Sequence, residues 1–183
     1  MRGTGYSLDR IGDSRASRAR LALLGVWSGA MLAFGGLFVP AAFEHLPTQL
    51  AASVLGDGFA ALDRCGAVIG VICIALGWSD ARATNADRLR ALLPLAGVFA
   101  HLTSALAVTP QIRALRVAAG GAIGTLAAGD PELAQRFASL HSVSRALFAL
   151  AGASALLACV WDGFALQARA AAGVSRDAES ADR

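Results

Sequence analysis

His101 is the titratable side chain that lies deepest in an apolar stretch of this sequence. It is the only such group between Ala91 and Ile112, and Thr103 and Ser104 lie beside it. An ionisable group inside an apolar helix is costly, so such residues mark candidate functional sites. A histidine here could ligate a haem or a metal, relay protons, or bond as a neutral ring to a neighbouring hydroxyl or backbone carbonyl. The sequence leaves these alternatives open.

Other metal-binding residue types gather where the apolar runs end. Glu44 and His45 follow the first run, and His141 precedes the last one. Imidazole and carboxylate ligands suit zinc or copper, and Asp57 or Asp63 could complete such a site. No short ligand spacing such as HxxxH or CxxC accompanies them, so a solvated membrane interface is the alternative interpretation.

His101 and His141 are also candidate axial ligands of one haem. At 1.5 Å per residue, His101 is about 12 Å inside the boundary near Thr109, whereas His141 lies near that boundary or beyond it. A depth difference of roughly 10–15 Å argues against ligation by both histidines. Having no cofactor is the simplest expectation, and a haem or a transition metal is the alternative.

Sequence patterns of common enzymes are missing. The chain has no GxSxG, P-loop or HExxH pattern and no paired carboxylates inside an apolar run. We therefore expect no enzymatic activity. The formal net charge of +3 is the difference between 16 basic and 13 acidic residues, and the basic ones, all arginine, lie mainly between the apolar runs. This pattern indicates orientation in a membrane rather than binding to nucleic acid.

The gaps between charged residues predict an all-α membrane protein with four transmembrane helices. Residues 21–43 carry no charge, and only His101 interrupts 91–112. Roughly 20 apolar residues cross the hydrocarbon core, so both runs are long enough. Two shorter runs, 65–79 and 146–161, span the core when a flanking arginine extends toward the headgroups. The predicted helices cover residues 19–43, 59–79, 88–109 and 137–168.

The arginines also predict the orientation of the bundle. Eleven of the 16 lie in the two terminal segments and the loop between the second and third helices. The positive-inside rule places this side, with both termini, in the cytoplasm. We expect a basic cytoplasmic tail (1–18), a four-helix transmembrane domain (19–168) and a disordered cytoplasmic tail (169–183). The lysine-free, alanine-rich composition suggests the inner membrane of a bacterium with a GC-rich genome.

The segment 117–129 is apolar but too short to span the membrane. We expect an interfacial loop or helix there, and a re-entrant segment is the alternative. Asp130-Pro131 after it is typical of a helix start, with an N-cap followed by proline at the first helical position.

Two glycine pairs predict close helix packing. Gly25 and Gly29, like Gly66 and Gly70, are four residues apart and lie on one helix face. Without Cβ atoms, such faces let helix backbones approach closely in lipid. We expect these faces to support a homo-oligomer. The three cysteines fall within or beside predicted spans and are interpreted as packing residues.

Pro110 and two arginines follow the third predicted helix. Pro110 is expected to end that helix, because its ring excludes a backbone hydrogen bond. Arg113 and Arg116 are three residues apart and would share a face at the outer surface. They are expected to bind lipid phosphate or to pair with an acidic residue of a neighbouring segment; the candidates are Asp130, Glu132 and Glu44. A site for an anionic substrate is the alternative.

Several short motifs resemble the transmembrane protein 205-like family over about residues 21–165. They are Gly35-Gly36-Leu-Phe38, Phe43…Leu46-Pro47, Val108-Thr109-Pro110-Gln-Ile-Arg113…Arg116 and His141-x-x-Ser144. The resemblance implies a four-helix membrane bundle in which the Thr-Pro-x-Ile-Arg and His-x-x-Ser elements face one another at one membrane surface. That family has no established activity and is distantly similar to copper-resistance and haem-binding four-helix proteins. His101 does not belong to its pattern.

These observations give three functional hypotheses. The first is a structural or accessory membrane bundle that works alone or as a homo-oligomer. The second is a protein that handles a metal or a haem through His101 or through the histidines near the outer face. The third is a small oligomeric transporter, for which the buried polar groups are few.

Overall fold

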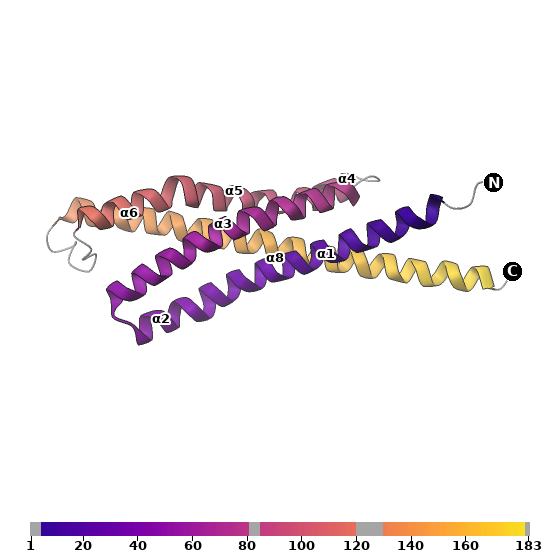
Figure 1. Ribbon diagram of the computed structural model, residues 1–183, viewed down its shortest axis with the longest axis horizontal. Helices are drawn as coiled ribbons and strands as arrows, with labels where there is room; N and C mark the ends of the chain where they lie inside the picture. The colour runs from indigo at the N-terminus through magenta and orange to yellow at the C-terminus, as the bar shows by residue number, and fades with distance from the viewer. Residues whose placement is uncertain (1–4, 81–84, 120–129, 182–183) are drawn as a thin grey trace.

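The computed structural model describes residues 5–80, 85–119 and 130–181, and the regular structure in these ranges is helical. Four helical segments are long and apolar enough to cross a membrane: 15–45, 48–78, 85–118 and 131–172. They form an elongated bundle with both chain ends on one side (Figure 1). We call this side the termini end and the opposite one, where Pro47 lies, the Pro47 end. The predicted four-helix membrane architecture is confirmed.

The first and third spans each contain a π-helical segment that ends two residues before a proline. The first span runs through α1 (Gly5–Ala33), η1 (Phe34–Phe38) and α2 (Val39–His45), which contains Pro40. The third runs through α5 (Leu95–Thr103), η2 (Ser104–Val108) and α6 (Thr109–Ala118), which contains Pro110. A proline ring clashes with the carbonyl four residues earlier, and the wider π turn accommodates it. The prediction that Pro110 ends the third helix is therefore wrong.

The third span is broken near the termini end. It begins with α4 (Asn85–Leu92), and a turn at Leu93-Pro94 separates α4 from α5. A continuous helix over 88–109 was the sequence-based expectation. The break follows from Pro94, which cannot donate a backbone hydrogen bond to the carbonyl of Arg90.

The second and fourth spans are single helices longer than predicted. α3 (Thr48–Asp80) begins directly after Pro47, and α8 (Pro131–Ala181) has 51 residues. Oδ1 of Asp130 accepts a hydrogen bond from the Leu133 amide (3.0 Å), which confirms the predicted N-cap before Pro131. Residues 169–181 are helical where a disordered tail is predicted, because this alanine-rich stretch has high helix propensity. Residues 120–129 of the segment predicted to be an interfacial loop or helix, with a re-entrant segment as the alternative, lie outside the described ranges.

The spans form a ring in which α1 and α5 each pack against both α3 and α8. The core contains Leu24, Trp27 and Met31 of α1, which pack against a small-residue face of α8: Ala151, Ala155 and Ala158. Small residues at these positions let the large side chains of α1 approach the α8 backbone. The outer surface is apolar, as contact with lipid requires.

Two of the three tryptophans lie where an interfacial belt would place them. Trp78 and Trp161, near the termini end, are 57% and 39% exposed, whereas Trp27 is 2% exposed. Trp27 is thus a core residue with a polar edge, and that edge points to a buried polar centre.

Candidate functional site

The polar centre of the bundle is His101 of α5, which is 1% exposed. Its Nε2 accepts a hydrogen bond from Nε1 of Trp27 (3.1 Å), and its Nδ1 is 2.9 Å from Oδ1 of Asp63 on α3. The hydroxyl of Ser104 in η2 donates to Oδ2 of Asp63 (2.6 Å). We call these four residues the Asp63 centre. Three of the four spans contribute to it.

The directions of these bonds fix where the protons lie. An indole N–H only donates, so Nε2 of His101 is the acceptor and carries no proton. A neutral imidazole then carries its proton on Nδ1 and donates it to Asp63. An imidazolium would carry a proton on Nε2 as well and would lose the Trp27 bond. Oδ2 of Asp63 accepts from the Ser104 hydroxyl.

Glycines of α3 make room for the Asp63 centre. Gly66 and Gly70 follow Asp63 by three and seven residues, so all three share one helix face. A Cβ on Gly66 would overlap the His101 ring, at 2.6 Å from its Cδ2. A Cβ on Gly70 would lie 3.1 Å from Cη2 of Trp27. These glycines therefore admit side chains of the same bundle.

The Asp63 centre lies near the middle of the membrane. Arg90 and Arg116 mark the two ends of the third span and are about 39 Å apart along it, close to the bilayer thickness including headgroups. His101 is about 16 Å from Arg90 and about 22 Å from Arg116 by the same measure. The centre is therefore about as far from water as this bundle allows.

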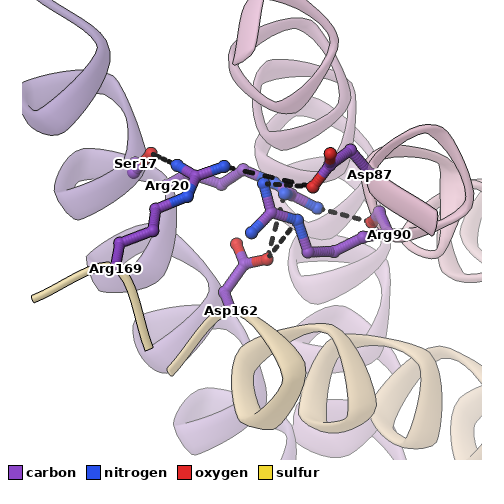
Figure 2. A network of polar contacts seen from close by, with 6 residues as sticks. All are labelled: Ser17, Arg20, Asp87, Arg90, Asp162 and Arg169. Carbon is purple, nitrogen blue, oxygen red and sulfur yellow. Dashed lines mark hydrogen bonds and ion pairs between the residues drawn. The ribbon is translucent and has the colours of Figure 1, made fainter. Parts of the chain in front are cut away.

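A second polar cluster lies at the termini end (Figure 2). Arg20 of α1 and Arg90 of α4 both approach Asp162 of α8, at 3.1 Å (Nη1) and 3.6 Å (Nε) from its Oδ1. All three side chains are at most 5% exposed. Gly77 of α3 admits Arg20, since a Cβ there would lie 2.8 Å from the guanidinium carbon. Buried charges are tolerated only when paired, so this cluster fixes all four spans against one another.

Three further residues extend this cluster toward the surface. Nη1 of Arg169 donates to the Ser17 hydroxyl (3.4 Å), and its Nη2 is 4.0 Å from Oδ1 of Asp87. Asp87 also lies 3.9 Å from Arg90. The cavity within the cluster is about 10 Å³, close to the space that one water molecule needs. The cluster, which we call the clamp, thus holds the spans together and has no room for a solute larger than a water molecule.

Side chains from the other spans bond to the backbone groups that the break at Pro94 leaves without helical partners. Nη2 of Arg20 donates to the Arg90 carbonyl (2.8 Å), the group that Pro94 leaves without its usual partner. Ser154 of α8 donates to the Leu93 carbonyl (2.9 Å) and accepts from the Gly97 amide (3.2 Å). Buried backbone groups need such partners.

The Pro47 end carries the arginines that follow the third span. Arg113 lies 3.7 Å from Asp57 of α3, and both side chains are mostly exposed, so this pair adds little stability. The pairing of Arg113 with Asp130, Glu132 or Glu44 is thus replaced by one with Asp57. Arg116 lies against Gly56, where a Cβ would be 3.0 Å from its Nη1.

The remaining candidate residues do not join the Asp63 centre. His141 is exposed on α8 and stacks on Phe137 at 6.0 Å between ring centroids. Glu44 and His45 are exposed at the end of α2. In the part of the chain that the structure describes, no three His, Cys, Asp or Glu side chains are grouped to hold a metal ion. The metal and haem hypotheses stay predictions, and a metal on His101 would have to displace Trp27 or Asp63.

The other motif residues line the same end of the bundle. Thr109 and Ser144 are partly buried, whereas Pro110 is exposed. Among the described residues, the hydrogen bonds of the Asp63 centre join Trp27, Asp63, His101 and Ser104 and do not reach these three.

Sequence reasoning did not connect Asp63 with His101. The sequence predicts Asp63 only as a possible further ligand of an outer metal site with Glu44, His45 and His141. The available signal was its position on the glycine face of Gly66 and Gly70, which marks the side of α3 that packs inward. Asp162 gave no comparable signal, since it also ends an apolar run and is typical of a membrane flank.

A comparison with known protein families matches residues 22–121 to a family described as "Domain of unknown function (DUF4149)". The match contains all four residues of the Asp63 centre and ends before α8. No curated protein and no solved structure matches the chain significantly. Because the matched residues make up more than half of its length, the chain belongs to the DUF4149 family.

Proposed function

We propose that this protein is a small multi-pass membrane protein that exchanges a proton at Asp63. The observation that carries the proposal is the carboxylate of Asp63, 7% exposed, held between Nδ1 of His101 and the hydroxyl of Ser104. Ionisable residues buried in membrane helices serve in ion pathways and proton relays.

Both oxygens of Asp63 have hydrogen-bond partners inside the core: Nδ1 of His101 lies at Oδ1 and the Ser104 hydroxyl at Oδ2. A proton that reaches the centre from one surface crosses half of the membrane. The membrane potential therefore changes the free energy of this proton by about 1 kcal/mol per 100 mV.

The π segment η2 supports this role. Ser104 is its first residue, and the carboxylate oxygen that it contacts is the one that can take up the proton. Single π turns in membrane and soluble helices often lie at functional sites. Ser104 accepts a hydrogen bond from the neutral acid and donates one to the carboxylate, so it serves both states.

Infrared difference spectroscopy between alkaline and acidic buffer tests the proposal on the full chain in lipid vesicles. We expect a carbonyl band of a protonated carboxyl that disappears in Asp63→Asn. The band should shift in Ser104→Ala, because that hydroxyl contacts Oδ2. Asp57→Asn is the matched control, since Asp57 is exposed on the same helix. A band that survives in Asp63→Asn would refute the proposal.

The fluorescence of Trp27 gives a second measurement. The chain has three tryptophans, so Trp78→Phe with Trp161→Phe leaves Trp27 as the only one. A neighbouring imidazolium quenches indole emission. If Asp63 takes the proton, the emission of Trp27 stays unquenched while the infrared band appears. Quenching in step with that band would assign the proton to His101 instead.

A second candidate function is an accessory bundle that forms a homo-oligomer. The specific observation is that Gly25 and Gly29 of α1 are exposed and have no atom within 4 Å of an added Cβ. Gly66 and Gly70, by contrast, are occupied within the bundle. Of the two predicted oligomer faces, only the α1 face is therefore available to a second copy of the chain.

Cross-linking in native membranes tests this candidate. We expect a dimer that Gly29→Leu abolishes, because the larger side chain prevents close approach of two α1 helices. Gly163→Leu on α8 is the control, since Gly163 also has open space around it. Recovery of monomers alone from the unaltered protein would count against the accessory function.

We also assign the chain to the transmembrane protein 205-like group, with both termini in the cytoplasm and the protein in a bacterial inner membrane. The arginine distribution and the His141-x-x-Ser144 motif support these assignments. Reporter fusions at each terminus test the orientation: both fusions should report a cytoplasmic location. A periplasmic signal from either terminus would refute it.

A further inference from the structure

One nitrogen of a cationic side chain at the Pro47 end, Nε of Arg116, lacks a hydrogen-bond partner within the described residues. This nitrogen is shielded from solvent. The guanidinium lies against Gly56 of α3, which leaves room for it beside the helix backbone. A buried donor without an acceptor is rare in folded proteins and indicates a missing water or ion.

The surroundings of Arg116 favour an anion as that partner. The charges of both Arg116 and Arg145 act on the ring of His141, so these three basic groups lie near one another. The carboxylate on the facing part of α3, Asp57, lies 3.7 Å from Arg113, and its charge also acts on Arg116. The segment 120–129 that follows α6 has no charged residue in its sequence. Two guanidinium charges, those of Arg116 and Arg145, therefore act on the same place beside His141.

The depth of Arg116 matches that of lipid phosphate. Arg116 is about 22 Å from His101 along the third span. Half of a bilayer including its headgroups is about 20–22 Å thick. A guanidinium at this level meets phosphate groups, which it binds with two parallel charge-assisted hydrogen bonds.

We propose that Arg116 and Arg145 bind the phosphate of a phospholipid headgroup at the Pro47 end. Arg116 supplies the shielded donor between α3 and α8, and Arg145 supplies a second charge one turn after His141 on α8. This site is independent of the Asp63 centre, so either can fail without the other.

Native mass spectrometry of the delipidated full chain in detergent tests the site, with phosphatidylglycerol as the probe. Diacylglycerol serves as the phosphate-free probe. We expect Arg116→Gln and Arg145→Gln each to weaken phosphatidylglycerol binding by roughly ten-fold, the loss of one charge-assisted contact. Arg136→Gln is the matched control, because it removes the same charge from an exposed position at the same end. It should bind the lipid as the unaltered protein does.

Four results would overturn the proposal. An equal loss of phosphatidylglycerol binding in Arg136→Gln would mean that the headgroup is attracted by the surface charge in general. Equal binding of diacylglycerol would mean that the phosphate is not recognised. Displacement of the lipid by inorganic phosphate at matched concentration would mean that the site takes a free anion. If Arg116→Gln does not fold, Arg145→Gln decides the question alone, and unchanged lipid binding in that variant refutes the site.

Discussion

Gly66→Ala tests whether the glycine face of α3 is what admits His101 into the core. The added methyl group would overlap the imidazole, which cannot swing aside without breaking its bonds to Trp27 and Asp63. The same change at Gly163 of α8 meets open space. Both variants add the same methyl group to a helix, so they differ only in the packing around it.

The expected changes in the free energy of unfolding have opposite signs for Gly163→Ala and Gly66→Ala. Replacing a glycine by alanine inside a helix stabilises it by about 0.5–1 kcal/mol when space is available. Overpacking a filled core costs about 1–3 kcal/mol, and a lost buried hydrogen bond adds about 1 kcal/mol. Gly163→Ala should thus be slightly stabilising, and Gly66→Ala should be less stable than it by about 2–4 kcal/mol.

Thermal unfolding followed by circular dichroism in one detergent measures this difference. For a chain of this length we expect the midpoints of the two variants to differ by roughly 5 °C or more. In the background of Trp78→Phe with Trp161→Phe, the emission maximum of Trp27 should shift in Gly66→Ala only, because its indole N–H loses the His101 acceptor. Equal midpoints and an unshifted emission would show that His101 does not occupy the Gly66 groove.

Three other substitutions follow from the same contacts, each measured by the same unfolding midpoint. Asp162→Ala should destabilise the protein by about 3–5 kcal/mol, because it leaves two buried guanidiniums without their shared carboxylate; a change below that of Asp57→Ala, which breaks an exposed pair, would contradict the clamp. Ser154→Ala should cost about 1–3 kcal/mol, since it leaves a buried amide and a carbonyl unsatisfied at the Pro94 break. Trp27→Phe should cost at least about 1 kcal/mol, because it removes the donor to Nε2 of His101; an unchanged midpoint would mean that this bond does not hold the ring.

Much of the fold could be predicted because lipid imposes a simple rule on sequence. Charge-free runs of membrane length can only be helices, since each backbone amide must bond within its own segment. Four spans, their order and the N-cap at Asp130 follow from such local patterns. Helix breaks were harder to predict, because a proline can either end a helix, bend it or be accommodated by a π turn. Pro94 breaks the third span, whereas Pro110 does not.

The candidate site was predicted only in part. His101 could be singled out from the sequence because it interrupts a long apolar run. Its partners could not, because Trp27 and Asp63 are 74 and 38 residues away and lie on different spans. Spacing within one helix reveals which residues share a face, but it does not reveal which face of another helix they meet.

The sequence by itself determined that this chain crosses the membrane with four helices, since hydropathy and the position of charges are local properties. Only the tertiary structure decided what the buried polar residues do. Asp63 and Asp162 both border apolar runs, yet one meets an imidazole in the core and the other meets two guanidiniums at the termini end. The physical reason is that their surroundings depend on the rotation and depth of each helix against its neighbours, which the packing of all four spans sets together.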